Sequence, residues 1–166
     1  MSGAFSPTEK LAKHHDVSAF SCGEESLDLW LKRYAWISQQ SDLTTTYVTH
    51  RNQHVVGYHS LAAGSVNKQE ATERVAKGLP NYPIGVVLLA RLAVDRREHG
   101  RGLGRALLKD ALLRAVSAAE IVGVRAVLVH ALNDEARRFY ARFDFEPSPV
   151  DPLHLMLLMK DIRASR

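Results

Sequence analysis

The feature that most constrains the fold is an apolar segment that runs into a glycine-rich turn and then into a helical pattern. Residues 86–94 are apolar apart from Arg91, as expected for a strand that is covered on both faces of a sheet. Three glycines follow within residues 100–104, and residues 102–119 repeat apolar side chains at helical spacing. A strand, a tight turn and a helix N-terminus present backbone N–H groups that can bind an anion. The sequence therefore predicts an α/β fold with an anion-binding loop.

The spacing of the glycines narrows the choice of anion. The pattern Gly-x-Gly-x-Gly lacks the third glycine position of a dinucleotide fingerprint and the Gly-Lys-Ser/Thr of a nucleoside triphosphate loop. Arg97, Arg101 and Arg105 add positive charge around the turn, and a glycine backbone can approach phosphate oxygens closely. We therefore expect a pyrophosphate ligand. The alternative is an ordinary helix N-terminus whose glycines serve only tight packing.

The remaining apolar patterns predict further strands and helices. A helix is expected within residues 21–40, with a capping box at Ser21–Glu24 and with Leu27, Trp30, Leu31 and Tyr34 on its core face. Asp110 is expected on the polar face of its helix, and residues 64–85 are expected to form a surface connection. The other predicted elements are a hairpin of strands at 44–49 and 55–62, strands at 124–131 and 153–159, and a helix at 133–143.

Composition excludes several classes of protein. The longest apolar run, residues 84–90, falls far short of the roughly 20 residues needed to cross a bilayer. Residues 1–16 lack the apolar core of a secretory signal. The one cysteine, Cys22, cannot form an internal disulfide, and the eight histidines show no metal-ligand spacing, so no metal is expected. We expect a single cytoplasmic domain over residues 1–166.

Positive charge is concentrated in one part of the chain. The net charge is only +4, but eleven Lys/Arg stand against six Asp/Glu between Arg91 and Arg142. This local surplus fits a polyanionic ligand, which is either a phosphorylated cofactor or a nucleic acid.

Two motifs resemble those of the GNAT N-acetyltransferases. The first reads Leu92-Ala93-Val94-Asp95 and then Arg97-x-x-Gly100-x-Gly102-Leu103-Gly104-x-x-Leu107. The second reads Asn133-x-x-Ala136-x-x-Phe139-Tyr140-x-x-Phe143-x-Phe145. The resemblance implies the GNAT fold, in which helices flank a mixed central sheet. It also implies that two adjacent parallel strands splay apart to admit the pantetheine arm of acetyl-CoA, the co-substrate.

The same resemblance implies how acetyl-CoA binds. The backbone of residues 92–94 would pair with the pantetheine arm, Asn133 would contact that arm, and N–H groups of the glycine-rich turn would bind the pyrophosphate. The implied cofactor-binding residues are Leu92, Ala93, Val94, Arg97, His99, Gly100, Arg101, Gly102, Leu103, Gly104, Arg105 and Asn133.

Acetyl transfer to an amine needs a neutral amine, a polarised thioester carbonyl and a proton for the departing thiolate. The resemblance makes Tyr140, in the second motif, the candidate donor of that proton. A phenol (pKa about 10) is a weaker acid than a thiol (pKa about 8.5), so donation is uphill by about 2 kcal/mol and remains feasible in a positioned site. The alternative is that Tyr140 is simply a core aromatic residue. Without an assigned base, an α-amino group is favoured over a lysine as acceptor. Glu70, Glu73 and Asp95 are carboxylates that no motif fixes as the base, so none is assigned. His99 and His130 could relay protons, and a structural role is the alternative for both.

Residues 20–31 and 87–95 resemble the GNAT toxins of bacterial toxin–antitoxin pairs. This resemblance implies acetylation of the α-amino group of aminoacyl-tRNA, a block of translation, and neutralisation by a ribbon-helix-helix antitoxin. The basic surplus beside the cofactor loop suits a tRNA backbone. Arg91 lies inside an apolar strand, where a charge is costly unless it is paired. A structural ion pair is therefore the alternative to a tRNA contact for Arg91. The candidate tRNA-contacting residues are Arg91, Lys77, Arg137 and Arg138, with Lys68, Arg74 and Arg142 as further members.

Two other functions stay open at the level of sequence. One is an ordinary GNAT N-acetyltransferase that acts on a small-molecule amine or on a protein N-terminus or lysine. The other is a CoA-binding module without catalytic activity. A homodimer, the identity of the aminoacyl-tRNA and the antitoxin interface are left open as well.

Overall fold

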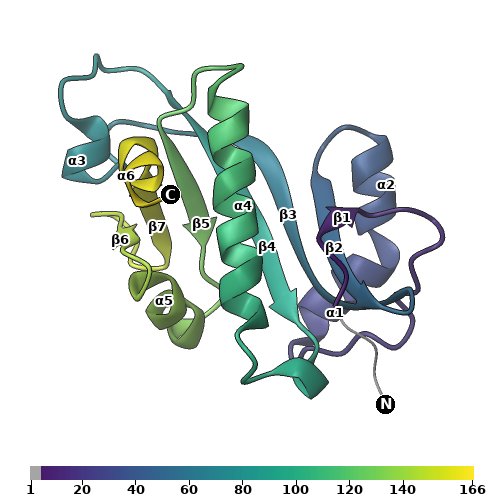
Figure 1. Ribbon diagram of the computed structural model, residues 1–166. Helices are drawn as coiled ribbons and strands as arrows, with labels where there is room; N and C mark the ends of the chain where they lie inside the picture. Colours follow the sequence, from purple (N-terminus) through teal and green to yellow (C-terminus); the bar gives the residue numbers. More distant parts are fainter. Residues whose placement is uncertain (1–4) are drawn as a thin grey trace. The chain divides into compact units, whose positions relative to one another are not determined.

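A computed structural model describes residues 5–166 of the chain (Figure 1). Residues 1–4, which begin the segment in which no secretory signal is expected, lie outside the described residues. The chain divides into two compact units, of which unit 1 comprises Met1–Ala62 and Ala90–Ala111 and unit 2 comprises Ala63–Leu89 and Leu112–Arg166. Within residues 5–166, no helix is both long enough and apolar enough to cross a bilayer.

The strands form a seven-stranded mixed sheet in the order β1-β2-β3-β4-β5-β7-β6. This mixed α/β architecture confirms the predicted fold class. The elements in chain order are β1 (Glu9–Lys10), α1 (Glu25–Arg33), α2 (Ala35–Gln40), β2 (Thr45–Arg51), β3 (His54–Val66), α3 (Glu73–Ala76), β4 (Ile84–Val94), η1 (Arg96–Glu98), α4 (Leu103–Ala119), β5 (Ala126–His130), α5 (Asp134–Ala141), β6 (Glu146–Pro147), β7 (His154–Leu158) and α6 (Met159–Ser165).

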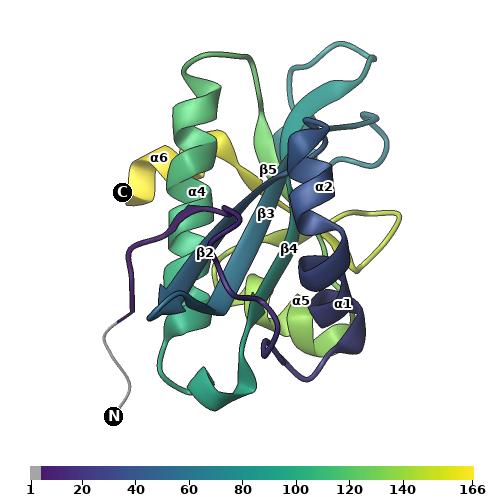
Figure 2. The same ribbon diagram turned by 90° about the vertical axis from the view of Figure 1, so that its right-hand side faces the viewer.

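Unit 1 contains the predicted hairpin. β2 pairs antiparallel with β3, and the two residues between them, Asn52 and Gln53, have φ of 50° and 71°. This left-handed conformation is the one that a two-residue hairpin turn requires. Figure 2 shows α1 and α2 together on one face of β2 and β3. The prediction of a hairpin over this segment is confirmed.

Neighbouring side chains of β3 point to opposite faces of the sheet. Tyr58 is fully buried, and its hydroxyl donates to the carbonyl of Leu27 at 2.7 Å. His59 is equally buried on the other face, where its Nε2 lies 2.8 Å from a carboxylate oxygen of Asp110. Its Nδ1 has no hydrogen-bond partner among residues 5–166. The prediction that Asp110 belongs to the polar face of α4 is therefore wrong, because the buried imidazole needs a polar partner there.

The helix predicted within residues 21–40 is two helices, α1 and α2, that meet at Tyr34. The predicted capping box is wrong, since Glu24 is the N-cap of α1 and makes no side-chain capping bond. The N–H of Ser21 donates instead to the carboxylate of Asp95 at 3.1 Å. Tyr34 lies at the joint, 51% exposed, because the change of helix moves it off the apolar stripe. The other predicted core residues of this segment, Leu27, Trp30 and Leu31, do pack in the core of unit 1.

Unit 2 contains the parallel strand pair. β4 and β5 pair in parallel from Val86↔Ala126 to Leu89↔Val129, and β4 continues to Val94 beyond the last of these pairs. β7 pairs antiparallel with β5, and α6 follows it directly (Figure 1). The strand predicted around residues 86–94 is thus a central strand, as expected.

The predicted surface connection at residues 64–85 is only partly at the surface. β3 continues into it as far as Val66, and α3 lies within it. Ala71 and Val75 are buried in the core of unit 2. These apolar side chains fix the connection to the sheet, a role that its charged and turn-forming residues conceal in the sequence.

Candidate active site

Backbone conformation shapes the glycine-rich loop after β4. Gly100 and Gly102 both have φ of 79°, in the left-handed region that favours glycine. A Cβ built on either residue would meet no heavy atom within 4 Å. Tight packing therefore does not explain these glycines, whereas their positive φ does, and a backbone of this kind can turn its N–H groups towards an anion. α4 begins at Leu103, directly after the loop.

A buried carboxylate, Asp95, anchors the start of the loop. It accepts hydrogen bonds from the N–H of Ser21 at 3.1 Å and from the N–H of Arg97 at 3.0 Å. The guanidinium of Arg97 donates two more bonds, at 2.9 and 3.0 Å. Burial alone would raise the pKa of Asp95, but the bonds from Arg97 and Ser21 outweigh burial and lower the pKa. The carboxylate therefore stays charged and holds the loop at Arg97.

A second carboxylate, Glu98, holds the middle of the loop. It is mostly buried and accepts two hydrogen bonds from Arg51, both at 3.2 Å, and one from Arg101 at 3.3 Å. The Arg51 guanidinium also lies over the ring of Phe5, 3.9 Å from its centroid. Arg97 and Arg101 thus have carboxylate partners inside the loop, while their side chains are 63% and 59% exposed. Their contact with a pyrophosphate stays a prediction.

The β4 residues before the loop use their side chains for packing. Leu92 and Val94 pack with Leu103, and Ala93 is buried in the other core cluster of unit 1. A strand-like ligand could therefore use only the backbone of these residues. Nε2 of His99 lies 2.7 Å from the carbonyl oxygen of Val94 and must donate to it. This bond gives His99 a structural role in the loop.

Arg91 contacts an aromatic ring. Its guanidinium carbon lies 4.1 Å from the ring centroid of Trp30, and Trp30 stacks on Tyr58 with centroids 6.1 Å apart. Burial lowers the pKa of Arg91, and a cation–π contact offsets part of the lost hydration. Within residues 5–166, a cation–π contact with Trp30 thus takes the place of the competing ion pair, and a tRNA contact of Arg91 stays a prediction.

The second motif places Asn133 and Tyr140 at opposite ends of α5. Asn133 is the N-cap, and its side-chain oxygen accepts a hydrogen bond from the N–H of Ala136 at 2.9 Å. Tyr140 is buried, and its ring contacts those of Phe139 and Phe145 at centroid distances of 5.2 and 5.5 Å. Burial raises the pKa of Tyr140, so the phenol keeps its proton at neutral pH, and transfer of that proton to a thiolate is more uphill than from a phenol of ordinary pKa.

The candidate tRNA-contacting arginines of α5 are both paired. Nε of Arg137 and Nη2 of Arg138 each lie 2.6 Å from an oxygen of Asp134, whose pKa these two hydrogen bonds lower. Their side chains are 35% and 71% exposed, and that of Lys77 is exposed as well. Among the further candidates, Arg74 bonds Asp161, Lys68 donates to the carbonyl of Leu79 at 2.7 Å, and Arg142 lies over Phe139 at 5.7 Å.

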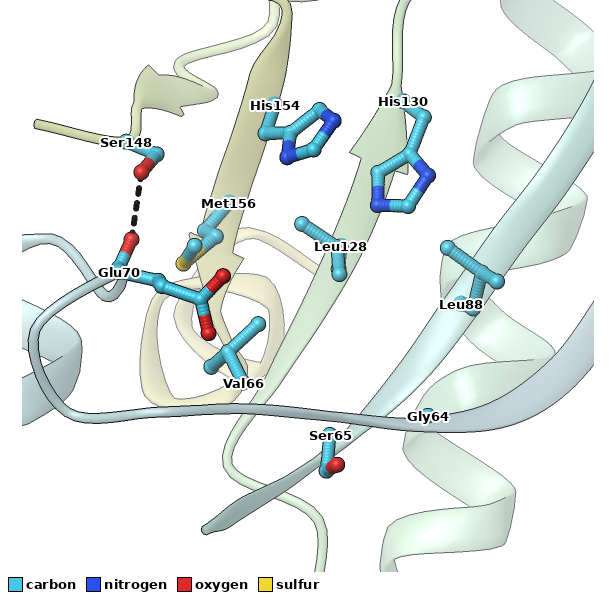
Figure 3. A pocket seen from close by; sticks show the side chains of 10 residues that line it. All are labelled: Gly64, Ser65, Val66, Glu70, Leu88, Leu128, His130, Ser148, His154 and Met156. Atoms are coloured by element: carbon cyan, nitrogen blue, oxygen red, sulfur yellow. Dashed lines mark hydrogen bonds between the residues drawn. The ribbon is translucent and has the colours of Figure 1, made fainter. Parts of the chain in front are cut away.

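A pocket of about 210 Å³ lies within unit 2 (Figure 3). Its wall is apolar where Leu128 and Met156 face it and polar where His130, His154 and Glu70 face it. His154 was missed in the sequence, although antiparallel pairing of β5 with β7 places it opposite His130. The only indication that His154 lies beside His130 is the register between β5 and β7, and this register cannot be inferred before the strand partners are known.

A group of titratable side chains around Glu9 in unit 1 invites comparison with a metal site. Ligand atoms of Glu9, His14 and His15 lie within 4.8 Å of one another, and His50 also bonds Glu9, at 2.8 Å. The N–H of Ala12 donates to Nδ1 of His15, so this ring carries its proton on Nε2 and donates it to Glu9 at 2.7 Å. A metal at Nε2 would drive the proton to Nδ1, which already faces a donor. These side chains therefore form a hydrogen-bonded cluster around the carboxylate of Glu9, and their arrangement does not favour a bound metal ion.

Comparison with known proteins bears on the family. A family model described as an acetyltransferase (GNAT) domain matches residues 42–147. The tRNA-acetylating toxin of Mycobacterium tuberculosis (strain ATCC 25618 / H37Rv) is 53% identical over 164 residues, which cover 99% of this chain and 98% of that toxin. The structure of AtaT complexed with acetyl-methionyl-tRNAfMet superposes with a TM-score of 0.90 at 28% identity, covering 98% of this chain and 99% of that chain. An AtaT mutant bound to the C-terminus of the antitoxin AtaR and acetyl-CoA gives a TM-score of 0.83 at 29% identity, covering 98% of each chain. The chain therefore belongs to the GNAT acetyltransferase family.

Proposed function

We propose that this protein is a toxin that moves an acetyl group from acetyl-CoA to the α-amino group of aminoacyl-tRNA and thereby blocks translation. The observation that carries the proposal is the 53% identity, over nearly the whole chain, to the tRNA-acetylating toxin of M. tuberculosis. The likeness to AtaT in complex with acetyl-methionyl-tRNAfMet supports the same class of acceptor. The toxin function is thus favoured over an ordinary N-acetyltransferase.

The co-substrate of this reaction is acetyl-CoA, and the loop after β4 fits its pyrophosphate. The positive φ of Gly100 and Gly102 and the anchoring of the loop by Asp95 and Glu98 support this assignment. An AtaT neighbour holds acetyl-CoA itself. We assign the pantetheine arm to the backbone of residues 92–94 and to Asn133, and the proton for the thiolate to Tyr140.

An antitoxin is the proposed protein partner. The antitoxin AtaR binds the neighbouring toxin AtaT through its C-terminus, and we propose that an antitoxin, of the ribbon-helix-helix type that the resemblance implies, neutralises this protein in the cytoplasm. We further propose that residues 1–166 act as one GNAT domain.

The first experiment offers the purified chain labelled acetyl-CoA with a pool of charged tRNA and, separately, with a panel of free amines and peptides. Label on the aminoacyl end of tRNA supports the toxin function. Label only on free amines or peptides would favour the ordinary N-acetyltransferase. Binding of acetyl-CoA without any transfer would favour a CoA-binding module.

The Gly102→Ala variant should raise the KM for acetyl-CoA about tenfold and change kcat by less than about threefold. A side chain at positive φ costs about 1–2 kcal/mol, and relief of that strain distorts the loop that binds the pyrophosphate. Gly78→Ala is the matched control, since Gly78 has φ of 76°, has the same empty surroundings and lies outside the loop. An equal rise in KM for both variants would count against the loop as the pyrophosphate site.

Reversing the charge of two α5 arginines, Arg137→Glu with Arg138→Glu, should lower kcat/KM for aminoacyl-tRNA about tenfold. Each lost phosphate contact should also flatten the dependence of the rate on salt concentration. The KM for acetyl-CoA should not change, and Arg163→Glu on α6 serves as an exposed arginine control. If the rate and its salt dependence match those of wild type, these two arginines do not contact tRNA.

A further inference from the structure

The pocket of unit 2 holds a pair of histidines that the proposed acid, Tyr140, leaves unused. His130 ends β5 and His154 begins β7, and the two residues are partners in the antiparallel register. Their rings stack with centroids 4.0 Å apart and planes inclined by 20°. Figure 3 shows both rings at one end of the pocket, with the carboxylate of Glu70 pointing into the same space. The pocket therefore combines two imidazoles and a carboxylate beside an apolar wall.

The charges around this pair favour a neutral His130. Partial burial lowers the pKa of His130, the neighbouring His154 lowers it further, and Asp151 raises it by a smaller amount. Nε2 of His154 lies 3.4 Å from a carboxylate oxygen of Asp151. Glu70 faces the pocket from the connection before β4, and the N–H of Asn67 donates to its carboxylate at 2.9 Å. His130 thus presents a basic nitrogen at neutral pH, while Glu70 supplies negative charge nearby.

The position of His130 along the sheet brings it to the end of the parallel pairing. That pairing ends at Leu89↔Val129, and His130 is the next residue of β5. On the proposed function, the end of this pairing between the two parallel strands of unit 2 is where the pantetheine arm would enter. Leu88 of β4 lines the same pocket as His130. An amine that attacks the acyl carbon would arrive beside this pocket.

Building on the proposed function, we propose that His130 is the general base that takes a proton from the α-ammonium group of aminoacyl-tRNA. His154 positions the ring of His130 by stacking, and Glu70 attracts the ammonium group into the pocket. An N–H bond of the ammonium breaks, and an N–H bond to His130 forms. The neutral amine then attacks the thioester carbonyl, and the C–S bond breaks.

The proton for the thiol and the second proton of the amine also balance. The departing thiolate takes the proton of Tyr140, and the second proton lost by the nitrogen restores the phenol. His130 returns its own proton to water, which it can reach because the residue, although partly buried, keeps solvent-exposed surface. The net products are the N-acetylated aminoacyl-tRNA, the free thiol of CoA and one proton in solution.

The test compares kcat/KM for aminoacyl-tRNA in wild type and in His130→Gln between pH 6.5 and pH 8.5. Wild type should vary by less than about threefold, because the pKa of His130 is lowered below its ordinary value of about 6.5 and most of the base is therefore neutral at the lower pH. The variant should be about 100-fold slower at pH 6.5, which is typical of a lost general base. Its rate should then rise about 25-fold to pH 8.5, because an α-amine with a pKa of about 8 deprotonates by itself.

Further variants separate the roles within the pocket. His130→Phe keeps an aromatic ring for stacking on His154 and should show the same steep pH profile as His130→Gln. Glu70→Gln should raise the KM for tRNA without changing the shape of the profile. His54→Gln, which replaces an exposed histidine bonded to Asp16 in unit 1, should behave as wild type. Melting temperature and acetyl-CoA affinity of each variant report on folding independently of the rate.

Equal pH profiles for wild type and His130→Gln would overturn the role of His130, whatever the absolute rates. A His130→Phe variant with wild-type rate and profile would overturn it as well, because phenylalanine cannot accept a proton. Failure of the proposed function looks different: wild type itself would then transfer no label to charged tRNA at any pH.

Discussion

Replacing Tyr140 with phenylalanine is expected to lower kcat for acetyl transfer about 10³-fold, because the thiolate then leaves without its proton donor. The aromatic ring remains, so its packing against Phe139 and Phe145 should persist. Affinity for acetyl-CoA should therefore stay within about twofold of wild type. Steady-state kinetics with charged tRNA and calorimetric titration with acetyl-CoA measure the two quantities.

The matched control for this substitution is Tyr82→Phe, at a tyrosine that is 67% exposed. It removes the same hydroxyl and should leave kcat unchanged. Because burial raises the pKa of Tyr140, the acid should stay protonated, and no loss of activity through its ionisation is expected up to about pH 10. A kcat loss smaller than tenfold in Tyr140→Phe would leave Tyr140 as a core aromatic residue only.

The second large effect is expected at Asp95, where alanine should lower the free energy of unfolding by about 3 kcal/mol. The substitution removes a buried anion and leaves the N–H groups of Ser21 and Arg97 without their acceptor. Chemical denaturation followed by fluorescence measures the change. The loop should also loosen, so the KM for acetyl-CoA should rise.

The pH dependence of this effect follows from the direction of the pKa shift. The pKa of Asp95 is lowered in the folded protein, so its contribution is fully present above the unfolded value of about 3.9. This contribution is lost as the pH falls through the lower pKa that Asp95 has in the folded protein. The difference in free energy of unfolding between wild type and Asp95→Ala should disappear in that pH range. Asp134→Ala, which removes an exposed aspartate with two arginine partners, is the control and should cost less than about 1 kcal/mol. A cost for Asp95→Ala no larger than this would contradict its anchoring role.

Much of the fold could be predicted because its signals are local. The hairpin turn at Asn52 and Gln53, and the strand, loop and helix around Gly100 and Gly102, can each be recognised from patterns in neighbouring residues. The errors arose where a partner lies far away in the sequence. Ser21 is bonded to Asp95 instead of to its own helix, and Asp110 is turned towards a histidine 51 residues earlier. Such partners cannot be inferred before the strands and helices are assembled.

In the candidate site, too, some residues could be predicted from local sequence and others could not. The glycines of the loop and the Asn133 and Tyr140 of α5 were recognisable from motif spacing. The carboxylate anchors of the loop and the stacking of His154 on His130 were not, because both depend on tertiary contacts. Motif spacing thus identifies the groups that are proposed to meet the ligand, whereas the groups that hold them in place are scattered along the chain.

The bond between His59 and Asp110 fixes the rotation of α4 about its own axis. Each residue of an α-helix advances by about 100° around that axis. Holding Asp110 against β3 therefore also decides which side of the helix Leu103 and the rest of the first turn present to the sheet. The segment from residue 95 to residue 105, which is proposed to bind an anion, consequently does not set its geometry by itself, since the orientation of the helix that follows it depends on a contact with the middle of β3.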